Sequence, residues 1–467
     1  MLLRSFFTNS VGILTSRIFG FLRDLMTASI LGANIYSDIF FVAFKLPNLF
    51  RRIFAEGAFT QAFLPAFTKS HHKGVFLAKT LVKFTLFLFF LSFVVMLVAP
   101  WLTKLIAYGF DETTIALATP LVRINFWYLL LIFLVTFAAS LLHYRHHFAT
   151  TAFSTALLNI AMIFALWLSD PNKPEQTVYY LSYGVLGGGL LQAFVHLIAL
   201  HKRRLCPLFF GGFKQINNQQ KTTREPYFYK NFFHAILGTS TAQLSAFVDT
   251  WLASFLAFGS ISYLYYANRI FQLPLALFAI ALSVAVFPRI TKQIKQKNMT
   301  QAKALLKHGF WFLSTLLGLA TVGGIVLSNE IIWGLFERGS FTQTDTTAAA
   351  WVLSMYMVGL LPFGLAKLFS LWLYAGERQK EAAKIAAWSL GTNIVLSLIL
   401  ITPMGAAGLA LASSLSGFIL LALTIKAYGT QDFLAIILSF KLPALIALLT
   451  FEGFVLYYLK DLFHGYL

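Results

Sequence analysis

Charged side chains interrupt some of the most apolar stretches of this sequence. Residues 45–65 read KLPNLFRRIFAEGAFTQAFLP, a run in which prolines, a glycine and several charges stand among apolar residues. An ionisable group in lipid costs several kcal/mol unless it is paired or hydrated, so each one needs a functional or structural reason. The cations in or near such stretches are Arg17, Arg23, Lys45, Arg51, Arg52 and Arg269. The acids beside them are Asp24, Asp38 and Glu56.

Arginine predominates in this set. A guanidinium group stays charged and presents a planar fork that binds phosphate oxygens in pairs. The cations outnumber the acids, so they predict a cavity for an anionic ligand, a phosphate or pyrophosphate. The acids would hold the empty site together and compete with the ligand. Two alternatives stay open: Arg51 and Arg52 could extend to a membrane interface, and Asp24 and Asp38 could be structural salt-bridge partners.

The spacing of these residues does not resolve which arginine faces the cavity. Asp38, Lys45 and Arg52 follow a seven-residue step, which places them on nearly one face of a helix. Pro47 lacks an amide hydrogen and clashes with the preceding turn, so a kink is expected just before it. Because a kink resets the helical phase, either Arg51 or Arg52 could face the cavity.

A second polar pair could bind a cation. Asp249 and Asn393 stand in apolar runs and could form a Na⁺ or H⁺ site, although both could equally be hydrogen-bonded packing residues. The loop sequence HYRHH at 143–147 is weak evidence for a metal, and Gly187–Gly189 indicates close helix packing. We expect no cofactor and no catalytic centre. The sequence has no nucleotide-binding motif, which argues against direct use of ATP.

These residues must be positioned by membrane helices. Of the 467 residues, 58% are hydrophobic and 11% are charged, against about 25% charged in soluble domains. The chain is therefore expected to be an integral membrane protein, with a first helix that is retained rather than cleaved. We predict 13 spans, near 8–31, 36–66, 77–99, 116–142, 151–168, 178–200, 231–257, 261–289, 309–328, 347–374, 382–402, 406–427 and 433–458.

The net charge of +19 follows a topological pattern. If the N-terminus is cytoplasmic, lysine and arginine collect on that side of the membrane, in 69–79, 202–230, 289–307 and 378–384. This is the positive-inside bias. It explains the basicity without a nucleic-acid partner and predicts a cytoplasmic N-terminus.

We interpret the chain as two copies of one design. GANIYSDIFFVAFKLP at 32–47 matches GSISYLYYANRIFQLP at 259–274, and PAFTK at 65–69 matches PRITK at 288–292. A parallel repeat of this kind occurs in one class of transporters, although chance similarity is an alternative. We predict an N-terminal six-helix lobe, a basic cytoplasmic linker, a second six-helix lobe, and an extra helix with a tail. Their limits are 1–201, 202–230, 231–428 and 429–467.

Several motifs resemble those of the MurJ (MviN) family across about residues 1–430. They are SRIFGFLRD at 16–24, SDIFFVAFKLPNLFRRIFAEGAFTQAFLP at 37–65, YYANRIFQLP at 265–274 and FERGSFTQTDT at 336–346. The resemblance implies an all-α fold of two six-helix bundles around a central cavity. It also implies that lipid II, the undecaprenyl-pyrophosphate-linked peptidoglycan precursor, is flipped across the bacterial inner membrane. The expected partners are lipid II, membrane lipids and cell-wall synthesis or division proteins.

The resemblance also assigns residues. Its cavity cations match Arg17, Arg23, Lys45, Arg51 and Arg269, and its acids match Asp38 and Glu56. This favours Arg51 over Arg52. The sequence departs from the family at Asn268 and Gln272, where acids are common, and in lacking a fourteenth span.

Four other functions remain as alternatives to a lipid II flippase. They are a flippase for another polyprenyl-pyrophosphate glycan, a drug or cation antiporter of the same fold, a membrane glycosyltransferase and a scaffold. The excess of cations argues against an antiporter for cationic drugs. The short, acid-poor extracytoplasmic loops argue against a glycosyltransferase.

Overall fold

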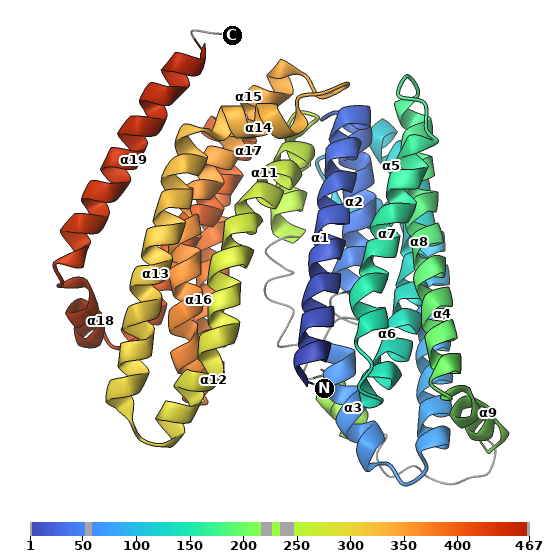
Figure 1. Ribbon diagram of the computed structural model, residues 1–467. Helices are drawn as coiled ribbons and strands as arrows, with labels where there is room; N and C mark the ends of the chain where they lie inside the picture. The colour runs from blue at the N-terminus through green and yellow to red at the C-terminus, as the bar shows by residue number, and fades with distance from the viewer. Residues whose placement is uncertain (1, 52–57, 216–226, 234–246, 465–467) are drawn as a thin grey trace. The chain divides into compact units, whose positions relative to one another are not determined.

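The computed structural model describes residues 2–51, 58–215, 227–233 and 247–464 (Figure 1). The chain divides into two compact units, Met1–Trp251 and Leu252–Leu467, here called unit 1 and unit 2. All regular structure in the described ranges is helical, which confirms the predicted all-α fold.

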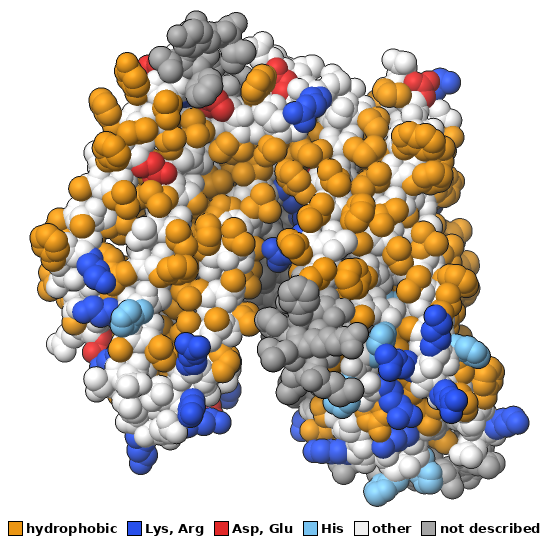
Figure 2. All heavy atoms as spheres, viewed as in Figure 1, with side chains coloured by type: hydrophobic (Ala, Val, Ile, Leu, Met, Phe, Trp, Pro, Cys, Tyr) orange, Lys and Arg blue, Asp and Glu red, His pale blue; other side chains and the backbone are white. Residues whose placement is uncertain are grey.

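Apolar helices dominate both units. Within the described ranges, nine helical segments are long and apolar enough to cross a membrane. Figure 2 shows hydrophobic side chains along the sides of the helices, with many lysines and arginines near helix ends. The protein is therefore a multi-pass membrane protein.

The helices of unit 1 follow one another through short turns. They are α1 (Leu2–Leu31), α2 (Ile35–Phe50), α3 (Ala58–Lys69), α4 (Lys73–Ile106), α5 (Glu112–Phe126), α6 (Tyr128–Tyr144), α7 (Ala149–Trp167), α8 (Pro174–Lys202) and α9 (Cys206–Lys214). The α2 helix continues through Pro47 and ends three residues later. Helix α1 packs mainly on α7, and α7 packs on α8.

Unit 2 repeats much of this order. Its helices are α11 (Ser260–Pro274), the π-helix η2 (Leu275–Ile280), α12 (Ala281–Lys295), α13 (Met299–Val326), α14 (Ser328–Phe336), α15 (Gln343–Val358), α16 (Leu360–Ala375), α17 (Gln379–Tyr428), α18 (Thr430–Ile437) and α19 (Lys441–His464). One residue separates α5 from α6, Trp127, and one separates α15 from α16, Gly359.

The two copies of the repeated motif share a backbone feature. Gly32 and Gly259 have φ angles of 69° and 94°, in the left-handed region that glycine adopts at little cost. Each glycine comes just before a helix that contains the matching proline, Pro47 in α2 and Pro274 in α11. The sequence repeat therefore corresponds to a repeated turn and helix.

Side-chain caps define where several helices start. Asn34 accepts hydrogen bonds from backbone N–H groups at the start of α2. Asp111 does the same for α5, and hydrogen bonds from Thr113 and Thr114 lower the pKa of its carboxyl group. Asp345 forms a capping box with Thr342 at the start of α15. Such caps satisfy donors that the first helical turn leaves unpaired.

An aromatic core holds α3, α4 and α6 together in unit 1. Phe59 stacks on Phe63 with 5.2 Å between ring centroids and meets Phe133 edge-on at 5.4 Å. The described segment 227–233 joins this core, because Phe228 is fully buried and lies 5.7 Å from Phe84. Each such pair contributes about 0.5–1.5 kcal/mol beyond area burial.

The unit boundary at Trp251 lies beyond the predicted start of the second lobe at residue 231. Segments 216–226 and 234–246, which surround this part of the chain, lie outside the described residues. The predicted domain limits therefore stay predictions.

The C-terminal helix differs from its prediction. One span is predicted over 433–458 and one is found, but it starts later, because the short helix α18 ends at Ile437 and the spanning helix α19 begins at Lys441. The two spans predicted on either side of residue 404 merge into α17, but Gly405 interrupts it with a φ of 56°. The hydropathy pattern therefore correctly predicts an interruption of the helix near residue 404.

Candidate functional site

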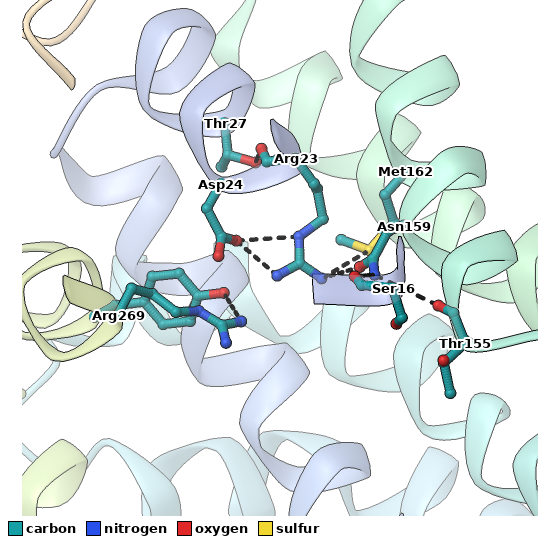
Figure 3. Close-up of polar contacts among 9 residues, drawn as sticks. Ser16, Arg23, Asp24, Thr27, Thr155, Asn159, Met162 and Arg269 are labelled. Carbon is teal, nitrogen blue, oxygen red and sulfur yellow. Dashed lines mark hydrogen bonds and ion pairs between the residues drawn. The ribbon is translucent and has the colours of Figure 1, made fainter. Parts of the chain in front are cut away.

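Arg23 on α1 makes several polar contacts in unit 1 (Figure 3). Its Nη2 donates to the Asp24 carboxylate at 2.6 Å, and its Nη1 donates to Asn159 Oδ1 at 2.9 Å. Arg23, Asp24 and Asn159 are 6%, 2% and 8% exposed. The guanidinium is therefore neutralised and oriented inside an apolar bundle, as a buried charge requires.

Asn159 joins α7 to α1 through both ends of its amide. Its Nδ2 donates to the Ser16 backbone carbonyl at 3.2 Å, while its Oδ1 accepts from Arg23. A Cβ at Gly20 would lie 3.4 Å from Asn159 Nδ2, an ordinary van der Waals contact, so α1 and α7 pack closely here. The sequence analysis does not identify Asn159 as a site residue. Its only distinguishing feature in the sequence is that it is a single amide within the apolar run LLNIAMIF.

The remaining predicted residues of unit 1 differ in their surroundings. Asp38 is buried near the start of α2, and Lys45 is half-buried further along that helix. Lys45 interacts electrostatically with Asp249. Arg17 is exposed on α1. The structure thus brings Lys45 and Asp249 into one electrostatic environment, a pairing that the sequence does not reveal.

Arg51 lies at the end of α2 and is half-buried. Its backbone N–H donates to carbonyls of the preceding turn, so it is the C-cap of that helix. Arg52 and Glu56 lie outside the described residues. The choice between Arg51 and Arg52 therefore stays a prediction.

In unit 2, Arg269 is positioned by a residue one turn earlier on α11. Its Nη2 donates to the Tyr265 hydroxyl at 2.9 Å, drawn as a dashed line in Figure 3. Its guanidinium carbon lies 5.1 Å from the Tyr265 ring centroid, within cation–π range. On the same helix, the Gln272 side-chain amide donates to Asn268 Oδ1.

The predicted cation pair is divided between the units. Asn393 belongs to unit 2, where its Nδ2 donates to Ser413 and its Oδ1 accepts from Ser397, both at 3.0 Å. Asp249 belongs to unit 1. Because serines occupy both ends of the Asn393 amide, its local geometry favours the packing interpretation.

In the HYRHH sequence, both ring nitrogens of His147 have hydrogen-bond partners. The Arg203 guanidinium donates to His147 Nδ1 at 2.8 Å, and His147 Nε2 lies 2.7 Å from the Thr150 hydroxyl. Burial lowers the pKa of His147, and the Arg203 charge lowers it further. Among the described residues, no group of three or more candidate ligands could hold a metal ion.

Comparisons with known proteins identify the family of this chain. The family model described as "Lipid II flippase MurJ" matches residues 27–467. A Helicobacter pylori (strain J99) protein named "Probable lipid II flippase MurJ" is 53% identical over 424 residues, which cover 89% of this chain and 92% of that protein. A Vibrio cholerae protein of the same name is 32% identical and covers 92% of this chain and 83% of its own.

Solved structures are similar as well. A lipid II flippase MurJ in an inward closed conformation has a TM-score of 0.79, 26% identity and 98% coverage of both chains. An inward-facing multidrug transporter of the MATE family has a TM-score of 0.64 at 11% identity, covers 92% of this chain and 95% of its own, and shows the fold alone. The family match and the close relatives decide the assignment: this chain belongs to the lipid II flippase MurJ family.

Proposed function

We propose that this protein is a transporter that flips lipid II from the cytoplasmic to the periplasmic leaflet of the bacterial inner membrane. The observation that carries the proposal is membership of the MurJ family over nearly the whole chain. The site residues stand in apolar helices, where charged groups mark a substrate or ion pathway.

The chemistry of the headgroup explains why arginine is needed. A pyrophosphate that leaves water requires donors to replace its hydration, and guanidinium groups supply paired N–H bonds. Arg23 already binds one carboxylate and one amide oxygen. We expect pyrophosphate oxygens to exchange with the Asp24 carboxylate, which would then act as a competing anion.

Arg269 would act differently from Arg23. Tyr265 fixes its guanidinium through a hydrogen bond and a ring contact, without a carboxylate in either interaction. We expect the guanidinium, oriented in this way, to contribute to attracting the anionic headgroup during the transport cycle.

Transport would proceed by alternating access, with a cytoplasmic N-terminus and the polyprenyl tail kept in lipid. We propose that membrane potential or a cation, Na⁺ or H⁺, drives the return step. Asp249 is the candidate carboxylate, and its interaction with Lys45 would have to be replaced when a cation binds.

The test is replacement of the native flippase in cells. The gene is expressed in bacteria depleted of their own lipid II flippase, and the lipid II accessible to a probe added to the periplasm is measured. We expect exposure to be restored by the wild type and lost in Arg23→Ala and in Arg269→Ala. A matched control is Arg338→Ala, an exposed arginine just after α14 that we expect to be dispensable.

Three results would each count against a different part of this proposal. If a well-expressed wild type restores no exposure, lipid II is not its substrate, and another polyprenyl-pyrophosphate glycan becomes the better candidate. If exposure survives both arginine variants, the function stands but the proposed contacts are wrong. If Arg338→Ala abolishes exposure as well, loss in the other variants says nothing about the site.

A further inference from the structure

A buried polar chain links α6, α7 and α8 in unit 1 and is separate from the candidate substrate site. The Tyr128 hydroxyl donates to Gln192 Oε1 at 3.4 Å, and Gln192 Nε2 donates to the Ser154 carbonyl at 3.0 Å. One turn further along α8, His196 Nδ1 lies 2.8 Å from the Gln192 carbonyl. Tyr128, Gln192 and His196 are all buried.

The glycine run at 187–189 makes room for this chain. A Cβ at Gly189 would lie 3.0 Å from the Tyr128 ring, and a Cβ at Gly188 would lie 2.8 Å from the Leu158 backbone. Larger residues would therefore push α6 and α7 away from α8. The close packing expected from this run thus serves to enclose Tyr128 and Gln192.

The hydrogen bonds define the state of the His196 ring. A backbone carbonyl only accepts, so Nδ1 must carry the proton that it donates to Gln192. In the neutral ring, Nε2 is then a bare acceptor. Nε2 is buried, and it has no hydrogen-bond partner within the described residues. An unsatisfied buried acceptor costs about 1–3 kcal/mol, so the site is poised to take up a donor.

The charged groups that act on His196 are mainly basic. His143 of α6 and His147 of the following loop interact with it electrostatically. Helix α7 carries no ionisable residue, and Glu112 and Arg123 of α5 are exposed. The α8 helix also packs on α1 and α2, whose ionisable side chains within the described part are Arg17, Arg23, Asp24, Tyr36, Asp38 and Lys45. The remaining ionisable residues of α8 are Glu175, Tyr179, Tyr180, Tyr183, His201 and Lys202.

We propose that His196 is a proton-binding site inside unit 1, with Nε2 as the atom that accepts the proton. The proton arrives from the end of the bundle where His143 and His147 lie. A charged imidazolium in this apolar interior requires water or an anion nearby. Proton binding therefore shifts unit 1 toward a second packing of α6 and α8 in which water reaches the polar chain.

The test measures the protonation state of the His196 ring by nuclear magnetic resonance and does not depend on lipid II transport. The full chain is placed in lipid nanodiscs with carbonyl-¹³C valine and ¹⁵N histidine. Val195–His196 is the only Val–His pair in the sequence, so the label selects His196 without any substitution. We expect Nε2 to change from a bare to a protonated nitrogen signal as the pH falls from about 8 to 4.

Hydrogen–deuterium exchange supplies the second readout. We expect peptides from α8 to gain exchange on acidification in the wild type and to lose that gain in His196→Gln. The matched control is His201→Gln, an exposed histidine on the same helix, which we expect to keep the gain.

Two outcomes would overturn the proposal. One is a His196 ring that stays neutral, with protonated Nδ1 and bare Nε2, across the whole pH range; a structural water on Nε2 would give this result. The other is an acid-induced gain of exchange that His196→Gln leaves unchanged. Failure of lipid II transport, by contrast, would leave both readouts intact.

Discussion

The bond between Arg23 and Asn159 should contribute measurably to the stability of unit 1. It joins α1 to α7 at 2.9 Å, and both side chains are less than 10% exposed. A double-mutant cycle with Arg23→Met, Asn159→Ala and the combined variant isolates this pair from the other contacts of Arg23.

The geometry sets the expected magnitude. A hydrogen bond from a charged donor contributes about 1.5–3 kcal/mol. Asn159→Ala alone should destabilise by about that amount or slightly more, because the bond to the Ser16 carbonyl is lost too. The coupling energy of the cycle should be about 1.5–3 kcal/mol, since each single variant already breaks the shared bond.

The assay is the free energy of unfolding, measured by denaturant titration of the purified protein in mixed micelles with a helix-sensitive signal. Thr155→Val serves as a control on the same face of α7, because its hydroxyl bonds only to a carbonyl of its own helix. A coupling energy below about 0.5 kcal/mol, which is typical of exposed pairs, would refute this reasoning.

Three further predictions concern packing, capping and pH. Gly184→Ala should destabilise by about 1–3 kcal/mol because its Cβ would lie 2.8 Å from Ala165, whereas Gly187→Ala on the same helix has open space and should be neutral or stabilising in the same titration. Asp345→Ala removes the cap of α15 and a 2.8 Å hydrogen bond from the Tyr263 hydroxyl, so the unfolding free energy of this variant should be about 1–2 kcal/mol below that of the wild type. An unchanged unfolding free energy would contradict the capping role. The pKa of His147 is lowered in the folded protein, so on acidification the unfolded chain takes up a proton at this residue at a higher pH than the folded chain does. The unfolding free energy of the wild type should therefore fall as the pH drops below about 6.5, and it should fall less steeply in His147→Gln. The same dependence of unfolding free energy on pH in both proteins would exclude this residue as the cause.

Much of the fold follows from local sequence signals. The glycines that start the two repeated helices need left-handed φ angles, and Gly405 interrupts the long apolar run between two predicted spans. Hydropathy marks these segments because lipid requires continuous apolar helices. At residues 433–458 it finds the span but places its start too early, because the short amphipathic helix α18 and the spanning helix α19 are both apolar enough to merge in a window average.

The sequence predicts the charged residues of the candidate site but not the residues that bind them, and the reason is physical. Charged residues in apolar runs are visible in the sequence because they are costly, and Arg23 and Arg269 stand out in this way. Their partners do not. Asn159 lies 136 positions from Arg23, and Tyr265 looks like an ordinary membrane aromatic. Tertiary contacts choose such partners, and periodicity within a single helix does not report them.

The polar chain of α8 shows the same limit. Gln192 and His196 are one turn apart in an apolar helix, a spacing that could draw attention to them. Their importance becomes visible only with Tyr128 from α6 and the buried Nε2 atom.

The most direct test of the central claim uses the purified protein in liposomes that contain labelled lipid II and, separately, a labelled lipid with an uncharged headgroup. The quantity measured is the rate at which each label becomes accessible across the bilayer. We predict that the wild type accelerates only lipid II, and that Arg23→Ala and Arg269→Ala each slow it by about 10- to 100-fold, the loss of one charge-assisted contact. Equal acceleration of both lipids would contradict the account, as would no acceleration by folded wild-type protein under an imposed membrane potential or cation gradient.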